Sequence, residues 1–85
     1  MSGAHLEARV RAAVSDASRR DAASIGLDED LVERLALDSL GALHILAALE
    51  KRLGVRFPDE RLGELQTLRR LVEAARDAGA KETGP

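Results

Sequence analysis

The sequence contains no cysteine, tryptophan or tyrosine, and Phe57 is its single aromatic residue. Without cysteine, disulfide bonds, thiolate catalysis and cysteine-based zinc sites are excluded. Without aromatic rings, the chain lacks the stacking platform with which proteins hold single-stranded nucleic acid. Its 13 basic residues are outnumbered by 15 acidic ones and form no basic run. The charge pattern typical of a nucleic-acid-binding protein is therefore missing as well.

Long apolar runs are also missing. No stretch approaches the roughly 20 apolar residues of a membrane-spanning helix, and the N-terminal "MSGAHLEARV" has no apolar core of a signal peptide. We expect a soluble, cytoplasmic protein that is monomeric. Its 85 residues allow one small domain whose core is too thin for a deep enzymatic cleft. We assign residues 1–80 to this domain and expect residues 81–85 to form a disordered tail.

Aliphatic side chains recur at helical spacing in three parts of the chain. The first part predicts a helix from His5 to about Ala17, with Leu6, Val10 and Val14 on one face. The second predicts a helix from Leu40 to Leu53 whose apolar face is wide enough for a central position in the core. Gly54 follows as its left-handed stop. In the third, Thr67 caps a last helix, "LRRLVEAARDAG", which ends at Gly79.

The remaining segments are a long loop and a short helix. Residues from about 18 to 37 are expected to be pinned by Ile25, Leu27, Leu31 and Leu35 rather than by regular structure, although "LDEDLVERL" can form a turn or two of helix. The segment "ERLGEL", residues 60–65, predicts a short third helix. No alternating strand pattern is present. The fold class predicted is all-α: a four-helix bundle with a short third helix and a long loop between helices one and two.

The Asp38-Ser39 pair precedes the central helix and permits two interpretations. Either side chain can cap the helix by accepting a backbone N–H of its first turn. Ser39 can also be a modification site, since a phosphate ester there would face the positive end of the helix dipole. A nucleophilic serine is disfavoured, because no base lies close upstream and no GxSxG motif is present. We therefore predict no catalytic residue in this chain.

The order of these parts is similar to that of the acyl carrier proteins. The resemblance covers residues 6–78 and rests on "LALDSL" opening an apolar helix, followed by "ALEKRLGVRFPDE" and "LQTLRRLVEAA". It implies a four-helix bundle whose serine carries 4′-phosphopantetheine, transferred from coenzyme A by a phosphopantetheinyl transferase. The thiol of that arm holds acyl groups as thioesters, so the protein would be a carrier without catalysis of its own.

By position, the resemblance implies a role for each of several residues. Ser39 is the attachment site, Asp38 helps to engage the basic transferase, and Leu40 anchors the helix start. The surface that meets acyl-loading and acyl-processing enzymes comprises Leu40, Gly41, His44 and Ala47. The groove that can shelter the acyl chain comprises Leu43, Leu46, Leu65 and Leu68, although each leucine can equally be ordinary core.

The second helix departs from the acidic pattern of fatty-acid carriers, because Gly41, His44 and Ala47 stand on the matching face. This favours polyketide or other secondary metabolism over housekeeping fatty-acid synthesis. Two alternatives stay open: a free-standing aminoacyl, peptidyl or D-alanyl carrier, and a small helical interaction module in which Ser39 only caps. The two histidines, His5 and His44, are unpaired, so no metal site is expected.

Overall fold

The structure of the protein, a computed structural model, describes residues 3–57 and 66–80, and the side chains from His5 onward within those ranges. Four helices occupy the described residues, and no strand is present among them. They are α1 (Gly3–Ser18), α2 (Leu31–Leu35), α3 (Ser39–Leu53) and α4 (Leu68–Asp77). The predicted fold class, an all-helical bundle, is confirmed. None of these helices is long and apolar enough to cross a membrane.

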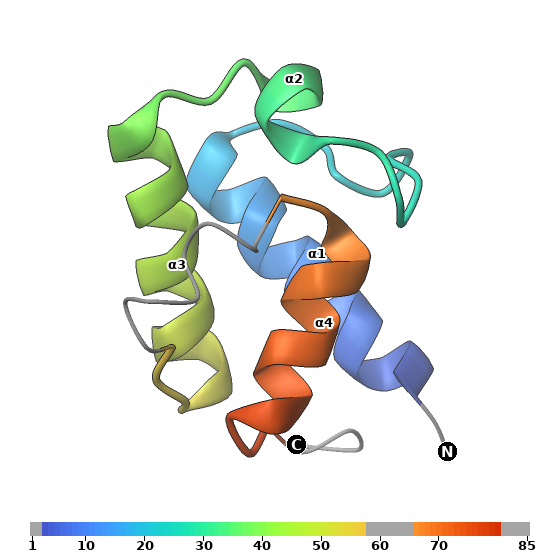
Figure 1. Ribbon diagram of the computed structural model, residues 1–85, viewed down its shortest axis with the longest axis vertical. Helices are drawn as coiled ribbons and strands as arrows, with labels where there is room; N and C mark the ends of the chain where they lie inside the picture. The colour runs from blue at the N-terminus through green and yellow to red at the C-terminus, as the bar shows by residue number, and fades with distance from the viewer. Residues whose placement is uncertain (1–2, 58–65, 81–85) are drawn as a thin grey trace.

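The three longer helices pack side by side, and α2 lies across the end of the bundle at which α3 begins (Figure 1). Helix α1 runs antiparallel to α3 and also contacts α4. The core between them is aliphatic, and its completely buried large side chains are Leu6, Val10, Val14, Leu49 and Leu68. The core thus forms from the leucine and valine repeats that define the helices in the sequence.

The predicted ends of α3 and α4 are confirmed. Thr67 caps α4, since its hydroxyl accepts a hydrogen bond from the Arg70 N–H at 3.1 Å. Gly54 ends α3 in the left-handed conformation, with φ of 68°. Gly79, with φ of 102°, follows the end of α4. Glycine reaches these positive φ values without a steric penalty, which explains why the helices stop where they do.

The long loop after α1 contains α2, a short regular element where "LDEDLVERL" permits a turn or two of helix. Asp30 caps it by accepting the N–H groups of Val32 and Glu33. It ends at Ala36, a non-glycine residue with φ of 52°. The expectation that regular structure plays no part in holding this loop is therefore wrong.

Four apolar side chains were expected to hold this loop against the core, and burial confirms three of them. Ile25, Leu31 and Leu35 are buried, and Leu27 is partly buried against the core. Two other expectations, the short helix at residues 60–65 and the tail at residues 81–85, lie outside the described residues.

Candidate functional site

The start of α3 shows which residue of the Asp38-Ser39 pair is the cap. Asp38 has extended backbone angles, and its Oδ1 accepts a hydrogen bond from the Gly41 N–H at 2.7 Å. Ser39 is the first helical residue and is exposed. Its hydroxyl makes no hydrogen bond to any described residue. Capping therefore belongs to Asp38, and the Ser39 hydroxyl is accessible for another role.

Gly41 allows the cap to close tightly. A Cβ atom at this position would lie 3.2 Å from the Asp38 carboxylate oxygen and 3.3 Å from a Leu37 methyl group. Both distances are tighter than ordinary van der Waals contacts, so a larger residue would push against the cap. The structure thus places Gly41, partly buried, beneath the cap.

The surroundings of Ser39 fit a phosphate ester. Asp38 takes the Gly41 N–H, and the Asp38 carbonyl takes the Ala42 N–H at 3.0 Å. The backbone N–H groups of Ser39 and Leu40 have no partner among the described residues. Unpaired N–H groups and the positive end of a 15-residue helix together favour an anion at this position.

Among the residues that the structure describes, none is placed to activate Ser39 as a nucleophile. His44 is exposed and, being five residues later, projects about 140° around the helix from Ser39. Within residues 3–57 and 66–80, no group of three or more His, Asp or Glu side chains could hold a metal ion. An exposed serine without an activating base is suited to modification by another enzyme.

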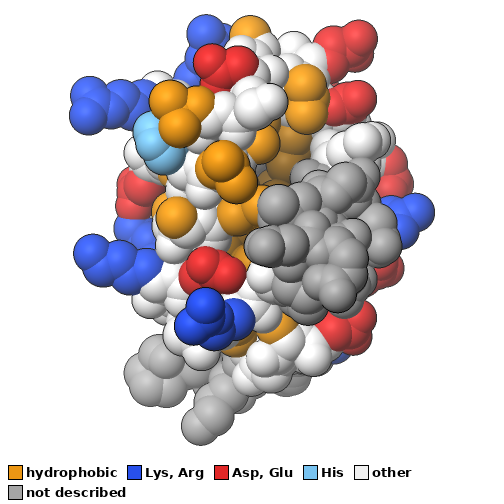
Figure 2. Space-filling model, turned by 60° about the vertical axis from the view of Figure 1, so that its left-hand side comes forward, with side chains coloured by type: hydrophobic (Ala, Val, Ile, Leu, Met, Phe, Trp, Pro, Cys, Tyr) orange, Lys and Arg blue, Asp and Glu red, His pale blue; other side chains and the backbone are white. Residues whose placement is uncertain are grey.

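Apolar side chains are exposed around the start of α3. Leu40 is 60% exposed, Leu43 is 50% exposed and Val32 of α2 is 44% exposed. Figure 2 shows hydrophobic side chains gathered on this face of the molecule, with Lys and Arg side chains along one border. Of the surface residues predicted to meet partners, Leu40, His44 and Ala47 are exposed, as such a role requires.

A small apolar cavity of about 40 Å³ lies between α2, α3 and α4. Its lining residues are Leu31, Val32, Leu37, Ala42, Ile45, Leu46 and Leu71. Of the predicted groove residues, Leu46 lines this cavity. Leu43 is half exposed and Leu68 is completely buried in the core, and neither lines the cavity. Leu65 lies outside the described residues.

The predicted groove did not include the cavity-lining residues that precede α3, which are Leu31, Val32 and Leu37. The sequence does contain a local pattern that could have predicted the part played by Leu37. Leu37 immediately precedes the Asp38 cap, and Ala42 is the fourth helical residue. This is the spacing of a hydrophobic staple, in which these two side chains pack together across the helix start. Leu37 and Ala42 both line the cavity, which agrees with that arrangement.

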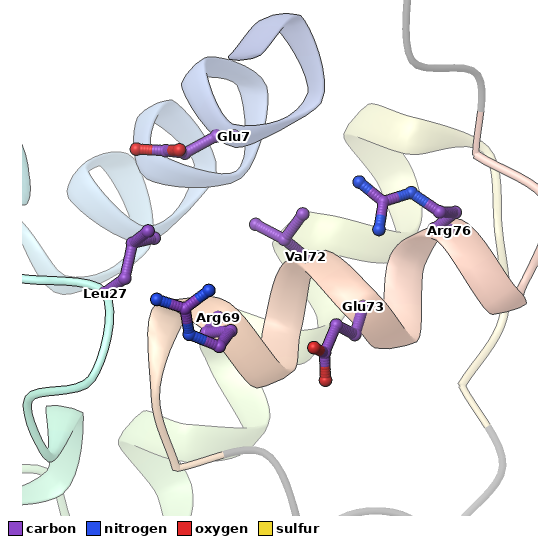
Figure 3. A pocket seen from close by; sticks show the side chains of 6 residues that line it. All are labelled: Glu7, Leu27, Arg69, Val72, Glu73 and Arg76. Carbon is purple, nitrogen blue, oxygen red and sulfur yellow. The ribbon is translucent and has the colours of Figure 1, made fainter. Parts of the chain in front are cut away.

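A larger hollow of about 170 Å³ opens between α1 and α4, and Figure 3 shows the side chains that line it. Two of its charged groups form ion pairs with residues outside the lining. Glu7 pairs with Arg11 at 3.0 Å, and Arg69 pairs with Asp28 at 2.8 Å. The hydrogen bonds from Arg69 lower the pKa of the Asp28 carboxyl. No residue of α3 lines this hollow, so it is separate from the surroundings of Ser39.

Comparison with known proteins gives consistent matches. A family model described as "phosphopantetheine attachment site" matches residues 8–75. An acyl carrier protein of Treponema pallidum is 35% identical over 65 residues, which are 76% of this chain and 83% of that protein. One of Streptomyces coelicolor is 35% identical over 71% of this chain and 65% of its own length. One of Helicobacter acinonychis is 28% identical over 80% of this chain and 87% of its own length.

Proposed function

The chain belongs to the acyl carrier protein family, and we propose from that premise that Ser39 is the residue to which its prosthetic group is attached. The cofactor of the family is a covalently attached 4′-phosphopantetheine, whose terminal thiol holds acyl groups as thioesters. In this proposal a phosphopantetheinyl transferase joins the Ser39 oxygen to the phosphate of the arm. The nucleotide half of coenzyme A is the leaving group.

The observation that carries this proposal is the division of roles at the start of α3. Asp38 caps the helix through its 2.7 Å hydrogen bond to the Gly41 N–H, while the exposed Ser39 hydroxyl has no partner among the described residues. If Ser39 itself were the cap, its oxygen would be occupied and its presence would be explained by structure alone. Because it is not, a chemical role for the hydroxyl explains its position better.

Each residue near Ser39 then has a task within this function. The unpaired N–H groups at the start of α3 stabilise the phosphodiester. Asp38 holds the helix start and adds a negative charge that the basic transferase can recognise. The exposed surface of α2 and α3, with Leu40 as its most exposed large apolar residue, meets acyl-loading and acyl-processing enzymes.

We further propose that the protein serves polyketide or other secondary metabolism in the cytoplasm. The support is the charge of α3, in which no acidic residue occurs before Glu50. The Glu50 carboxylate accepts a hydrogen bond from the Phe57 N–H at 2.8 Å, so it holds the segment after α3. Exposed His44 and Lys51 occupy the outer face. A partner that recognises a row of carboxylates on the carrier would find none there.

The experiment is incubation of the purified protein with coenzyme A and a promiscuous phosphopantetheinyl transferase, followed by intact-mass measurement. We expect wild type to gain the mass of one phosphopantetheine group and Ser39→Ala to gain nothing. Ser24→Ala, which removes another exposed serine, is the matched control and should be modified like wild type. Modification that persists in Ser39→Ala would contradict the assignment of the site. No modification of wild type would favour a helical interaction module.

A further inference from the structure

The loop between α1 and α2 is held to the bundle by polar contacts that converge on Arg11. The Arg11 Nη1 donates hydrogen bonds to the backbone carbonyls of Ala22 at 2.8 Å and Ile25 at 2.6 Å. Its Nε donates to the Glu7 carboxylate at 3.0 Å, and only 19% of its side chain is exposed. Hydrogen bonds from a charged donor are about twice as strong as neutral ones. The guanidinium on α1 therefore fixes the first half of the loop.

A second set of contacts holds the loop just before α2. The Arg69 backbone N–H donates to the Leu27 carbonyl at 3.0 Å, and the Leu31 N–H donates to the Gln66 carbonyl at 2.8 Å. The Arg69 guanidinium also binds both carboxylate oxygens of Asp28, at 2.8 and 3.2 Å. Figure 3 shows the Arg69 side chain directed toward Leu27. The loop is thus fastened to α1 at one place and to the start of α4 at another.

This fastened loop leads directly into α2, and α2 with Leu37 after it forms one wall of the apolar cavity beside α3. Leu31 and Val32 of α2 and Leu37 after it line one side, and Ala42, Ile45 and Leu46 of α3 line the other. An apolar cavity of about 150 Å³ is enough to hold a benzene ring. The present cavity is about 40 Å³, so it has room for about one or two carbon atoms. A longer chain does not fit within the cavity as the structure shows it.

We propose that Arg11 is a positioning residue for the cargo. By holding the carbonyls of the loop that leads into α2, it keeps α2 closed against α3, and this restricts the cavity to short acyl groups. Release of the loop widens the cavity and increases the chain length that it accepts. The inference rests on the proposed attachment at Ser39, because the cargo must be tethered beside this cavity.

The experiment compares how well the protein shelters thioesters of different length. Wild type and Arg11→Ala are loaded at Ser39 with acetyl, butyryl or octanoyl phosphopantetheine, supplied as the acyl-coenzyme A. For each acyl group, the rate of thioester hydrolysis on the protein is divided by the hydrolysis rate of the same acyl group on free pantetheine. A lower ratio means that the protein shelters the thioester. Each further CH₂ group that becomes buried shifts the sheltered population about fourfold. We expect wild type to slow the hydrolysis of the acetyl thioester more than that of butyryl or octanoyl, and Arg11→Ala to slow the hydrolysis of butyryl and octanoyl as well.

Two control variants separate this role from general stabilisation. Arg34→Ala removes an arginine of α2 that pairs with Glu29 and lines neither of the two hollows described above, so it should behave as wild type. Val10→Ala loosens the core on α1 but leaves the Arg11 contacts to the loop in place. It should lower stability without changing the dependence on chain length. Asp28→Asn weakens the second fastening and should act in the same direction as Arg11→Ala, which keeps the proposal testable if Arg11→Ala does not fold.

Several results would overturn the proposal. One is strong protection of the octanoyl thioester in wild type. Another is an unchanged dependence on chain length in folded Arg11→Ala, or in Asp28→Asn if Arg11→Ala is unfolded. A third is a Val10→Ala variant that changes the dependence as much as Arg11→Ala does. A failure of wild type to load at Ser39 would instead contradict the proposed function.

Discussion

Replacing Asp38 and Ser39 by alanine, one at a time, should separate the stability of α3 from the chemistry of its first residue. Asp38→Ala removes the acceptor of the 2.7 Å hydrogen bond from the Gly41 N–H. Loss of an N-cap side chain costs about 0.5–2 kcal/mol. Because this N–H is exposed to water, which can replace the lost partner, we expect a value near the middle of that range, about 1 kcal/mol. In a domain of this size it lowers Tm by roughly 4–8 °C.

Ser39→Ala should behave differently. Its hydroxyl makes no hydrogen bond to a described residue, and alanine has a higher helix propensity than serine by a few tenths of a kcal/mol or about 0.5 at most. We therefore expect the free energy of unfolding to be unchanged or slightly raised. Urea titration followed by far-UV circular dichroism measures both variants, since the chain has no tryptophan or tyrosine for fluorescence.

Asp38→Asn is the matched control, because asparagine caps helices about as well as aspartate. It should keep the stability of wild type while removing the charge that the transferase is proposed to recognise, so slower phosphopantetheine transfer to this variant would be an effect of charge alone. A loss of stability in Ser39→Ala as large as that in Asp38→Ala would refute the reasoning. It would mean that the serine, and not the aspartate, holds the helix start.

Three further predictions concern the loop and the exposed face of α3. Ala36→Gly should raise the free energy of unfolding by up to about 1 kcal/mol in urea titration, because φ of 52° at the end of α2 suits glycine better than alanine; a loss of stability would contradict this. Hydrogen bonds from Arg69 lower the pKa of Asp28 in the folded protein. The pair therefore stabilises the fold fully at pH values above the usual aspartate pKa of about 3.9. This contribution is lost as the pH falls through the lower pKa of the folded state. Asp28→Asn should thus be less stable than wild type at pH 6, and the difference should shrink below about pH 4 in denaturant titrations; a difference that persists at low pH would point to a cause other than the pair. Replacing His44 and Ala47 by glutamate should improve acyl transfer by fatty-acid synthesis enzymes and impair transfer by the native partner. The reaction of wild type with the native partner should depend only weakly on ionic strength. A steep loss of native transfer with added salt would show that charge dominates recognition.

The ends of the helices were predictable from the sequence because they depend on local chemistry. Thr67 at the start of α4 and Gly54 at the end of α3 act within one helical turn, so their neighbours in the chain define their roles. Burial of Leu49 and Leu53 follows in the same way from their helical spacing. Local signals of this kind, together with the apolar spacing of the three longer helices, predicted an all-helical bundle with Ser39 at the start of its central helix.

The assignment of the cap needed the three-dimensional structure. Aspartate and serine are almost equally good N-caps, so two such residues in succession leave the choice open. The choice depends on which residue is the last with extended backbone angles, and in the structure it is Asp38. The resemblance to the acyl carrier proteins had already given Ser39 as the attachment site, and the structure adds that the Ser39 hydroxyl is exposed and is not the cap.

The loop between α1 and α2 is the part that only the tertiary structure decided. The Arg11 guanidinium binds the carbonyls of Ala22 and Ile25, which are 11 and 14 residues away in the chain, and Arg69 binds Asp28 across 41 residues. Backbone carbonyls have no signature in the sequence, and one arginine on a charged helix face looks like any other. Periodicity reports the face on which a side chain lies, but not the distant group that it meets once the helices have packed. The cavity beside Ser39 has the same origin, because its walls come from three elements that approach one another only in the folded chain.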